Sequence, residues 1–208
     1  MESSGMERVY QLADWIMKIA YINLLAIFFS MVGLFVFGFF PAIAATFAVL
    51  RKWLIGYSDI PITKTFWCCY KKEFFKSNLI GFILVTVGSL LFINLSIAEI
   101  MGHKIIQYSY YPILAVWIIF LSACLYVFPV SLHYHVSIKQ IFKNAFLLLF
   151  VQPKNTIIMI ASIIILYFLL ISIPGLIPLF GVSLFAWIVM YFSLHTFNKL
   201  EENMDLAG

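Results

Sequence analysis

Charged residues are scarce in this 208-residue chain. Asp, Glu, Lys and Arg together make up 11% of it, against about 25% in an average soluble domain. Hydrophobic residues make up 64%, and no stretch is long and polar enough to form a separate soluble domain. We therefore expect a single integral membrane domain over residues 1–208, with only short segments facing water.

Residue patterns that carry enzyme chemistry are missing as well. The chain has no Walker motif, no nucleophile elbow and no His-Glu-x-x-His pair. No row of Asp, Glu, Lys or His crosses its apolar segments, as proton-coupled transporters usually need. The three cysteines are expected to be reduced thiols. We expect a protein that is not an enzyme, with no catalytic residue, cofactor or metal site.

Long apolar runs are what the sequence does contain. Residues 77–101 hold a single charge, and about 20 apolar residues cross the roughly 30 Å hydrocarbon core of a bilayer. A Gly-Phe-Phe-Pro break at residues 38–41 precedes a segment, 41–54, that is short for a full span. We expect an all-α, polytopic membrane helix bundle with about six membrane segments: 20–37, 41–54, 78–100, 112–132, 156–173 and 182–197. If residues 20–54 form one kinked span, the number is five.

The basic residues predict the orientation. Nine of the 13 Lys and Arg residues fall within 51–76 and 139–154, and such clustering in short loops marks the cytosolic side. This pattern explains the net charge of +4 without nucleic acid. It puts the C-terminus in the cytoplasm, and six segments would put the N-terminus there too.

Amphipathic helices are expected beside the spans, at residues 4–19 and within both basic loops. Such helices either lie on membrane lipids or dock in a groove on another protein, and the sequence leaves both interpretations open. The candidate partner-binding residues are Phe66, Trp67, Tyr70, Phe74, Lys71, Lys72, Phe142 and Lys143.

Three segments carry a resemblance to a known family. Residues 33–53 read GLFVFGFFPAIAATFAVLRKW, residues 65–81 read TFWCCYKKEFFKSNLIG, and residues 143–156 read KNAFLLLFVQPKNT. Together with Asn23-Leu24-Leu25 in the first span, they resemble the YesL-type family of bacterial integral membrane proteins, a family without a defined biochemical activity. The resemblance extends over most of the chain and implies a location in the bacterial plasma membrane.

The family context implies a function. Such proteins tend to be encoded beside carbohydrate importers of the ATP-binding-cassette (ABC) type in Gram-positive bacteria. The first hypothesis is therefore a non-enzymatic accessory subunit that docks on the permease of such an importer. The alternative is a small independent transporter or channel, which predicts a polar cavity lined by Asn23, Thr46, Thr86 and Asn94. A membrane-bound or lipid-handling enzyme is a weaker third, because the chain shows no catalytic constellation.

Overall fold

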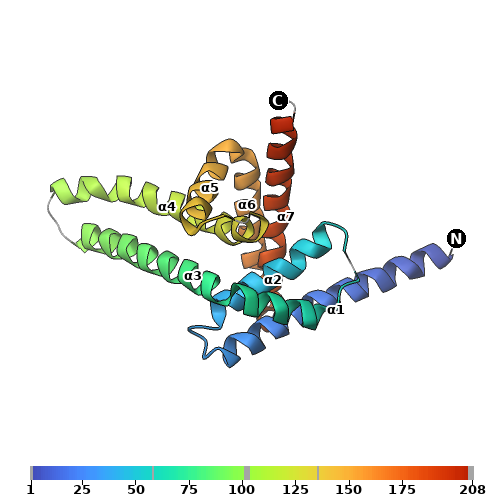
Figure 1. Cartoon of the computed structure of the whole chain (residues 1–208). Helices are drawn as coiled ribbons and strands as arrows, with labels where there is room; N and C mark the ends of the chain where they lie inside the picture. Colours follow the sequence, from blue (N-terminus) through green and yellow to red (C-terminus); the bar gives the residue numbers. More distant parts are fainter. Residues whose placement is uncertain (1, 58, 101–103, 135, 206–208) are drawn as a thin grey trace. The chain divides into compact units, whose positions relative to one another are not determined.

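The computed structural model describes residues 2–57, 59–100, 104–134 and 136–205. Over these residues the chain is built from helices and contains no strand, which confirms the expected all-α class (Figure 1). The helices are α1 (Glu2–Val32), α2 (Phe39–Leu54), α3 (Ile62–Ile100), α4 (Lys104–His133), α5 (Ile138–Val151), α6 (Pro153–Ser172) and α7 (Ile177–Asp205), with a 3₁₀ turn, η1 (Pro174–Leu176), before α7.

Among the described residues, five stretches are long and apolar enough to cross a membrane. They are Val9–Val32, Ile62–Ala98, Tyr110–His133, Pro153–Ser172 and Pro174–Glu202. The remaining predicted segment, 41–54, falls in α2, whose 16 residues extend for only about 24 Å. The chain is thus a multi-pass membrane protein, and α2 is the short helix that its sequence indicated.

Two helices run through boundaries that the sequence suggested. α1 is continuous where we expected an interfacial helix to end at residue 19, and the chain turns at 33–38, before the predicted break at 38–41. Pro41 is the third residue of α2, where a missing N–H is tolerated because that position lacks an intrahelical acceptor. α3 is likewise continuous through residues 76–78, since nothing there interrupts helix propagation.

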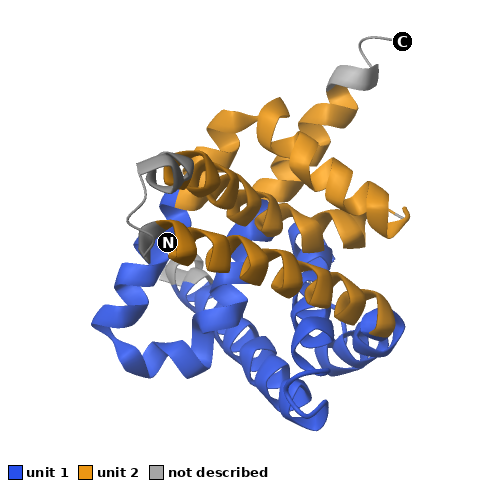
Figure 2. Cartoon of the chain, turned by 90° about the vertical axis from the view of Figure 1, so that its left-hand side faces the viewer, with its two compact units in different colours: residues 1–74, 161–191 blue, residues 75–160, 192–208 orange. Residues whose placement is uncertain are grey.

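The chain divides into two compact units (Figure 2). Unit 1 consists of Met1–Phe74 and Ala161–Tyr191, and unit 2 of Phe75–Ile160 and Phe192–Gly208. Helices α3, α6 and α7 each contribute residues to both units. The prediction of a single membrane domain stays a prediction.

In unit 1, α1 packs against the alanine-rich face of α2. Ala42, Ala44 and Ala45 are almost completely buried, and small residues of this kind let helix backbones approach closely in membrane proteins. The connecting turn is tight as well, because Leu34 and Phe35 have φ angles of 57° and 58°. Unit 1 therefore has a compact helical hairpin at its N-terminal end.

In unit 2, α4 packs on α5, and a group of buried polar side chains lies among apolar ones. The Tyr126 hydroxyl lies 2.8 Å from that of Thr156, and the Asn155 amide donates to the Phe192 carbonyl over 2.7 Å. It also donates to the Thr196 hydroxyl. These bonds satisfy polar groups that would otherwise be costly to bury.

Candidate interaction surfaces

The structure separates the candidate residues on α3 into buried and exposed ones. Phe66 and Tyr70 are 0% and 5% exposed. Both pack on Phe29 of α1, with ring centroids 5.3 and 5.2 Å from its ring. The Tyr70 hydroxyl also donates to the Phe29 carbonyl over 3.2 Å. These two side chains hold α3 against α1 inside unit 1 and are not available at its surface.

The exposed side of this helix combines an aromatic ring with lysines. Trp67 is 40% exposed; its ring stacks on Phe29 with centroids 5.2 Å apart. The Lys71 ammonium lies 4.3 Å from the centre of the Trp67 ring, in the range of a cation–π interaction. Lys72 is exposed. Phe74 is half-buried against Tyr70, with ring centroids 5.8 Å apart. The candidate residues that stay exposed on α3 therefore form a basic and aromatic surface.

The candidates on α5 belong to unit 2. The Gln140 side-chain oxygen accepts a hydrogen bond from the Ser137 N–H over 3.2 Å, which fixes the start of the helix. Phe142 is half-buried and Lys143 is exposed. The buried face contains Ile141, Ala145, Leu148 and Leu149.

Two exposed aromatic residues on α5 were missed by the sequence reasoning. Phe146 and Phe150 are 47% and 62% exposed, with ring centroids 5.1 Å apart. Their spacing of four residues puts them on one helix face. That spacing is the signal that could have found them, but membrane sequences contain many such pairs. With Lys143, they form the outer face of α5.

Of the four residues expected to line a polar cavity, two are buried and bonded to backbone groups, and two are exposed. The Asn23 amide bonds to the backbone of α7, and the Thr46 hydroxyl donates to the Ala42 carbonyl over 2.9 Å. Asn94 is exposed and donates to the Leu90 carbonyl of its own helix, and Thr86 is exposed.

A cavity of about 430 Å³ in unit 1 is almost entirely apolar. It lies among α2, α6 and α7 and is lined by Phe39, Ile43, Phe47, Ile163, Leu166, Tyr167, Leu170, Gly181, Val182, Phe185 and Ala186. Such a lining offers no set of hydrogen-bond partners for a sugar. Within the described part of the chain, no three His, Cys, Asp or Glu residues lie close enough together to hold a metal ion.

The ends of α4 and α7 in unit 2 meet at a small aromatic and ionic contact. The His133 ring lies 4.6 Å from the Phe197 ring between centroids, and its Nε2 is 3.2 Å from a Glu201 carboxylate oxygen. Burial, with a smaller contribution from Glu201, raises the pKa of the neighbouring Tyr134. The contact joins the two helix ends.

The fold and these surfaces define an all-α, multi-pass membrane protein. Within that class, the chain belongs to the family described as "Protein of unknown function, DUF624", whose profile matches residues 19–95. This match, together with a 33% identity to the Bacillus subtilis relative YesL, confirms the resemblance to the YesL type.

Three relatives from Bacillus subtilis (strain 168) support the membership. "Uncharacterized protein YteU" is 38% identical over 98% of this chain and 91% of its own length. "Uncharacterized protein YesV" is 32% identical over 100% of both chains. "Uncharacterized protein YesL" is 33% identical over 92% of this chain and 90% of its own. No solved structure matches the chain.

Proposed function

We propose that this protein is a non-enzymatic accessory subunit that docks on the permease of a carbohydrate ABC importer in the bacterial plasma membrane. The class of partner comes from the family context implied by the sequence resemblance. The observation that supports docking is the outer face of α5, where Lys143 and two exposed phenylalanines lie on a helix with an opposite, buried face.

α5 is suited to contact a partner because it is attached to its own unit and is too short to span. Its 14 residues extend for about 21 Å, and its buried face packs in unit 2, where α4 is its neighbour. Aromatic side chains are enriched among the residues that dominate binding energy at protein interfaces. The outer face therefore offers aromatic anchors beside a lysine, while the inner face fixes their position.

The proposed orientation puts both termini in the cytoplasm. Basic residues in 51–76 and 139–154 favour the cytosolic side for both segments. The packing of α1 against α2 through a tight turn supports a hairpin whose two ends lie on the same side. On this orientation α5 faces the cytosol, where the ATPase-bound side of a permease is also accessible.

A pull-down with variants of α5 tests the proposal. We expect the wild-type chain, purified from native membranes in mild detergent, to bring a permease pair that mass spectrometry identifies as part of a carbohydrate importer. The double substitution Phe146→Ala with Phe150→Ala removes both anchors. Since single anchors of this kind are worth about 2 kcal/mol or more, we expect recovery of the permease to fall at least tenfold.

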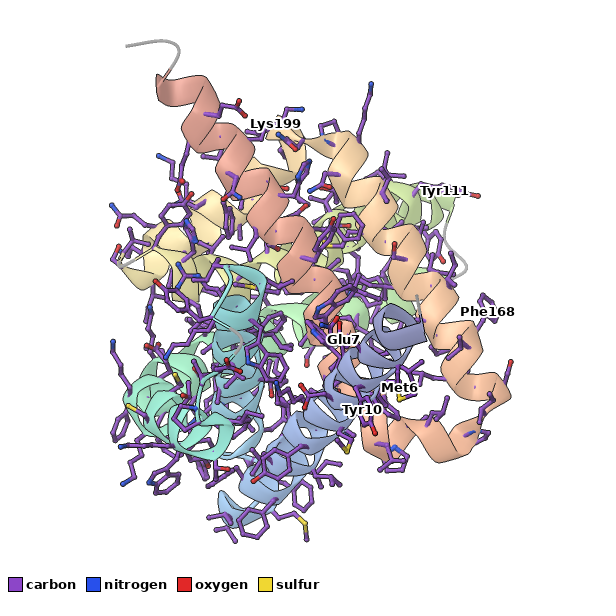
Figure 3. All side chains as sticks on the ribbon, turned by 90° about the vertical axis from the view of Figure 1, so that its right-hand side faces the viewer. Met6, Glu7, Tyr10, Tyr111, Phe168 and Lys199 are labelled. Atoms are coloured by element: carbon purple, nitrogen blue, oxygen red, sulfur yellow. The ribbon has the colours of Figure 1, made fainter. Side chains whose placement is uncertain are left out.

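A matched control separates docking from a general loss of apolar surface. Ile165 and Phe168 of α6 are 68% and 64% exposed, and Phe168 lies on the outer surface of its helix (Figure 3). The double substitution Ile165→Ala with Phe168→Ala is expected to leave recovery of the permease unchanged. If the wild-type chain brings no permease, the proposal fails and solute flux into liposomes becomes the test of independent transport.

A further inference from the structure

A shallow groove of about 430 Å³ lies along α1 beside the first residue of α3, within unit 1. Its lining is mostly apolar and consists of Met17, Lys18, Ala20, Tyr21, Leu24 and Ile62. The Tyr21 hydroxyl lies 2.8 Å from the hydroxyl of Thr63, so the two helices are joined at the polar edge of the groove. Figure 1 shows the start of α3 running beside α1.

One lysine lines the groove, and others follow close by in the sequence of α3. Lys18 lies in the groove itself and is paired with Asp14 over 2.7 Å. Lys64 follows Thr63 directly, and Lys64 and Lys71 are exposed seven residues apart on one face of α3. Between residues 51 and 74 the chain has five basic residues, Arg51, Lys52, Lys64, Lys71 and Lys72, against two acidic ones, Asp59 and Glu73.

The aromatic contacts of unit 1 fix the next turns of α3 against α1. Trp67 is fixed from behind by Phe29 and carries the Lys71 ammonium over its ring. An exposed Trp with lysines on both sides is typical of helices at the boundary between lipid and water. The ligand that matches an apolar groove with a basic edge has a hydrocarbon chain joined to a negative charge.

We propose that the groove binds one anionic phospholipid, with an acyl chain along Ala20 and Leu24 and the phosphate between Lys18 and Lys64. The apolar lining excludes water from the chain, and the two ammonium groups bind the phosphate through charge-assisted hydrogen bonds. A zwitterionic lipid fills the groove but lacks the net charge. Soluble glycerol 3-phosphate has the charge but lacks the chain.

Native mass spectrometry of the full chain in detergent micelles tests this site. The probes are dioleoylphosphatidylglycerol and dioleoylphosphatidylcholine, which share their acyl chains and differ in net charge. We expect one phosphatidylglycerol per chain, bound about tenfold more tightly than phosphatidylcholine. Lys18→Gln with Lys64→Gln is expected to abolish this preference.

Two further variants separate a built site from general attraction. Lys139→Gln with Lys143→Gln removes the same charge from exposed lysines of α5 and is expected to keep the preference. Ala20→Phe fills the groove without changing charge and is expected to weaken binding of both lipids about tenfold or more. Equal binding of the two lipids by the wild-type chain, an equal loss in both lysine variants, or displacement by glycerol 3-phosphate would each overturn the proposal.

Discussion

Gly38→Ala is expected to disrupt the turn between α1 and α2 and to leave most of the protein misfolded or aggregated. A Cβ atom at this position would lie 2.5 Å from the Ser30 carbonyl oxygen and 2.8 Å from the Cα of Gly33. Both are backbone atoms, which cannot move aside without opening the turn. Since overpacking against side chains alone costs about 1–3 kcal/mol, we expect a loss of about 3 kcal/mol or more.

The opposite glycine is under the same restriction. A Cβ at Gly33 would lie 2.2 Å from the Gly38 Cα and 2.8 Å from the Tyr70 hydroxyl. The turn already contains Leu34 and Phe35 in the left-handed region, at about 1–2 kcal/mol each. The Phe35 N–H donates to the Ser30 carbonyl over 2.8 Å, so it satisfies one of the last carbonyls of α1. The backbone can form this strained turn because neither glycine has a Cβ atom.

The measurement is the fraction of monodisperse protein in detergent as a function of temperature. Gly181→Ala is the control, because its added Cβ would meet only a side-chain atom of Ile177 at 3.6 Å. We expect this variant to be as stable as the wild type or slightly more so, since Ala is favoured over Gly within helices. If Gly38→Ala and Gly181→Ala unfold at the same temperature, the close contact between the two glycines is refuted.

The sequence predicted the fold correctly where it contains long apolar runs. Apolar runs of this length admit helices in a bilayer and little else, so the all-α class followed directly. Helix ends were harder to place. Because of Pro41, the break was predicted at residues 38–41, whereas the chain turns earlier. The turn contains Leu34 and Phe35 with left-handed φ angles, and neither residue type prefers that conformation.

The buried side of an amphipathic helix was the other point that the sequence could not decide. A period of 3.6 residues places Phe66 and Tyr70 on one face, but in a membrane protein an apolar face can meet lipid or another helix. The structure buries these two against Phe29 and leaves Trp67 exposed. The partner lies about 40 residues away along the chain, beyond the reach of any local pattern.

Asn23→Leu is expected to destabilise unit 1 strongly, because this amide bonds to three backbone groups of α7. Its oxygen accepts from the N–H groups of Val182 and Ser183, over 2.9 and 3.0 Å, and its NH₂ donates to the Pro178 carbonyl over 2.7 Å. In a regular helix, the N–H of residue 182 would bond to the carbonyl of residue 178. Asn23 therefore bonds to the carbonyl and to the N–H that a regular helix would pair with each other.

Leucine keeps the size of the side chain but removes all three bonds. Asn23 is 1% exposed, so water does not replace the lost partners. A buried backbone group left without a partner costs about 1–3 kcal/mol, although hydrogen bonds within membrane proteins often contribute nearer 1 kcal/mol. We expect a loss of about 2–4 kcal/mol in total, which lowers the unfolding temperature by roughly 5–15 °C.

Asn94→Leu is the matched control for this prediction. Asn94 is also an amide in an apolar segment, but it is exposed and donates only to the Leu90 carbonyl of its own helix. That carbonyl keeps its place in the helix when the amide is removed, so the unfolding temperature in detergent should change little. The comparison separates two roles for intramembrane asparagine. If the variants lose equal stability, an amide in either position contributes through its polarity alone. If only Asn23→Leu is unstable, its side chain is what fixes the start of α7 against α1.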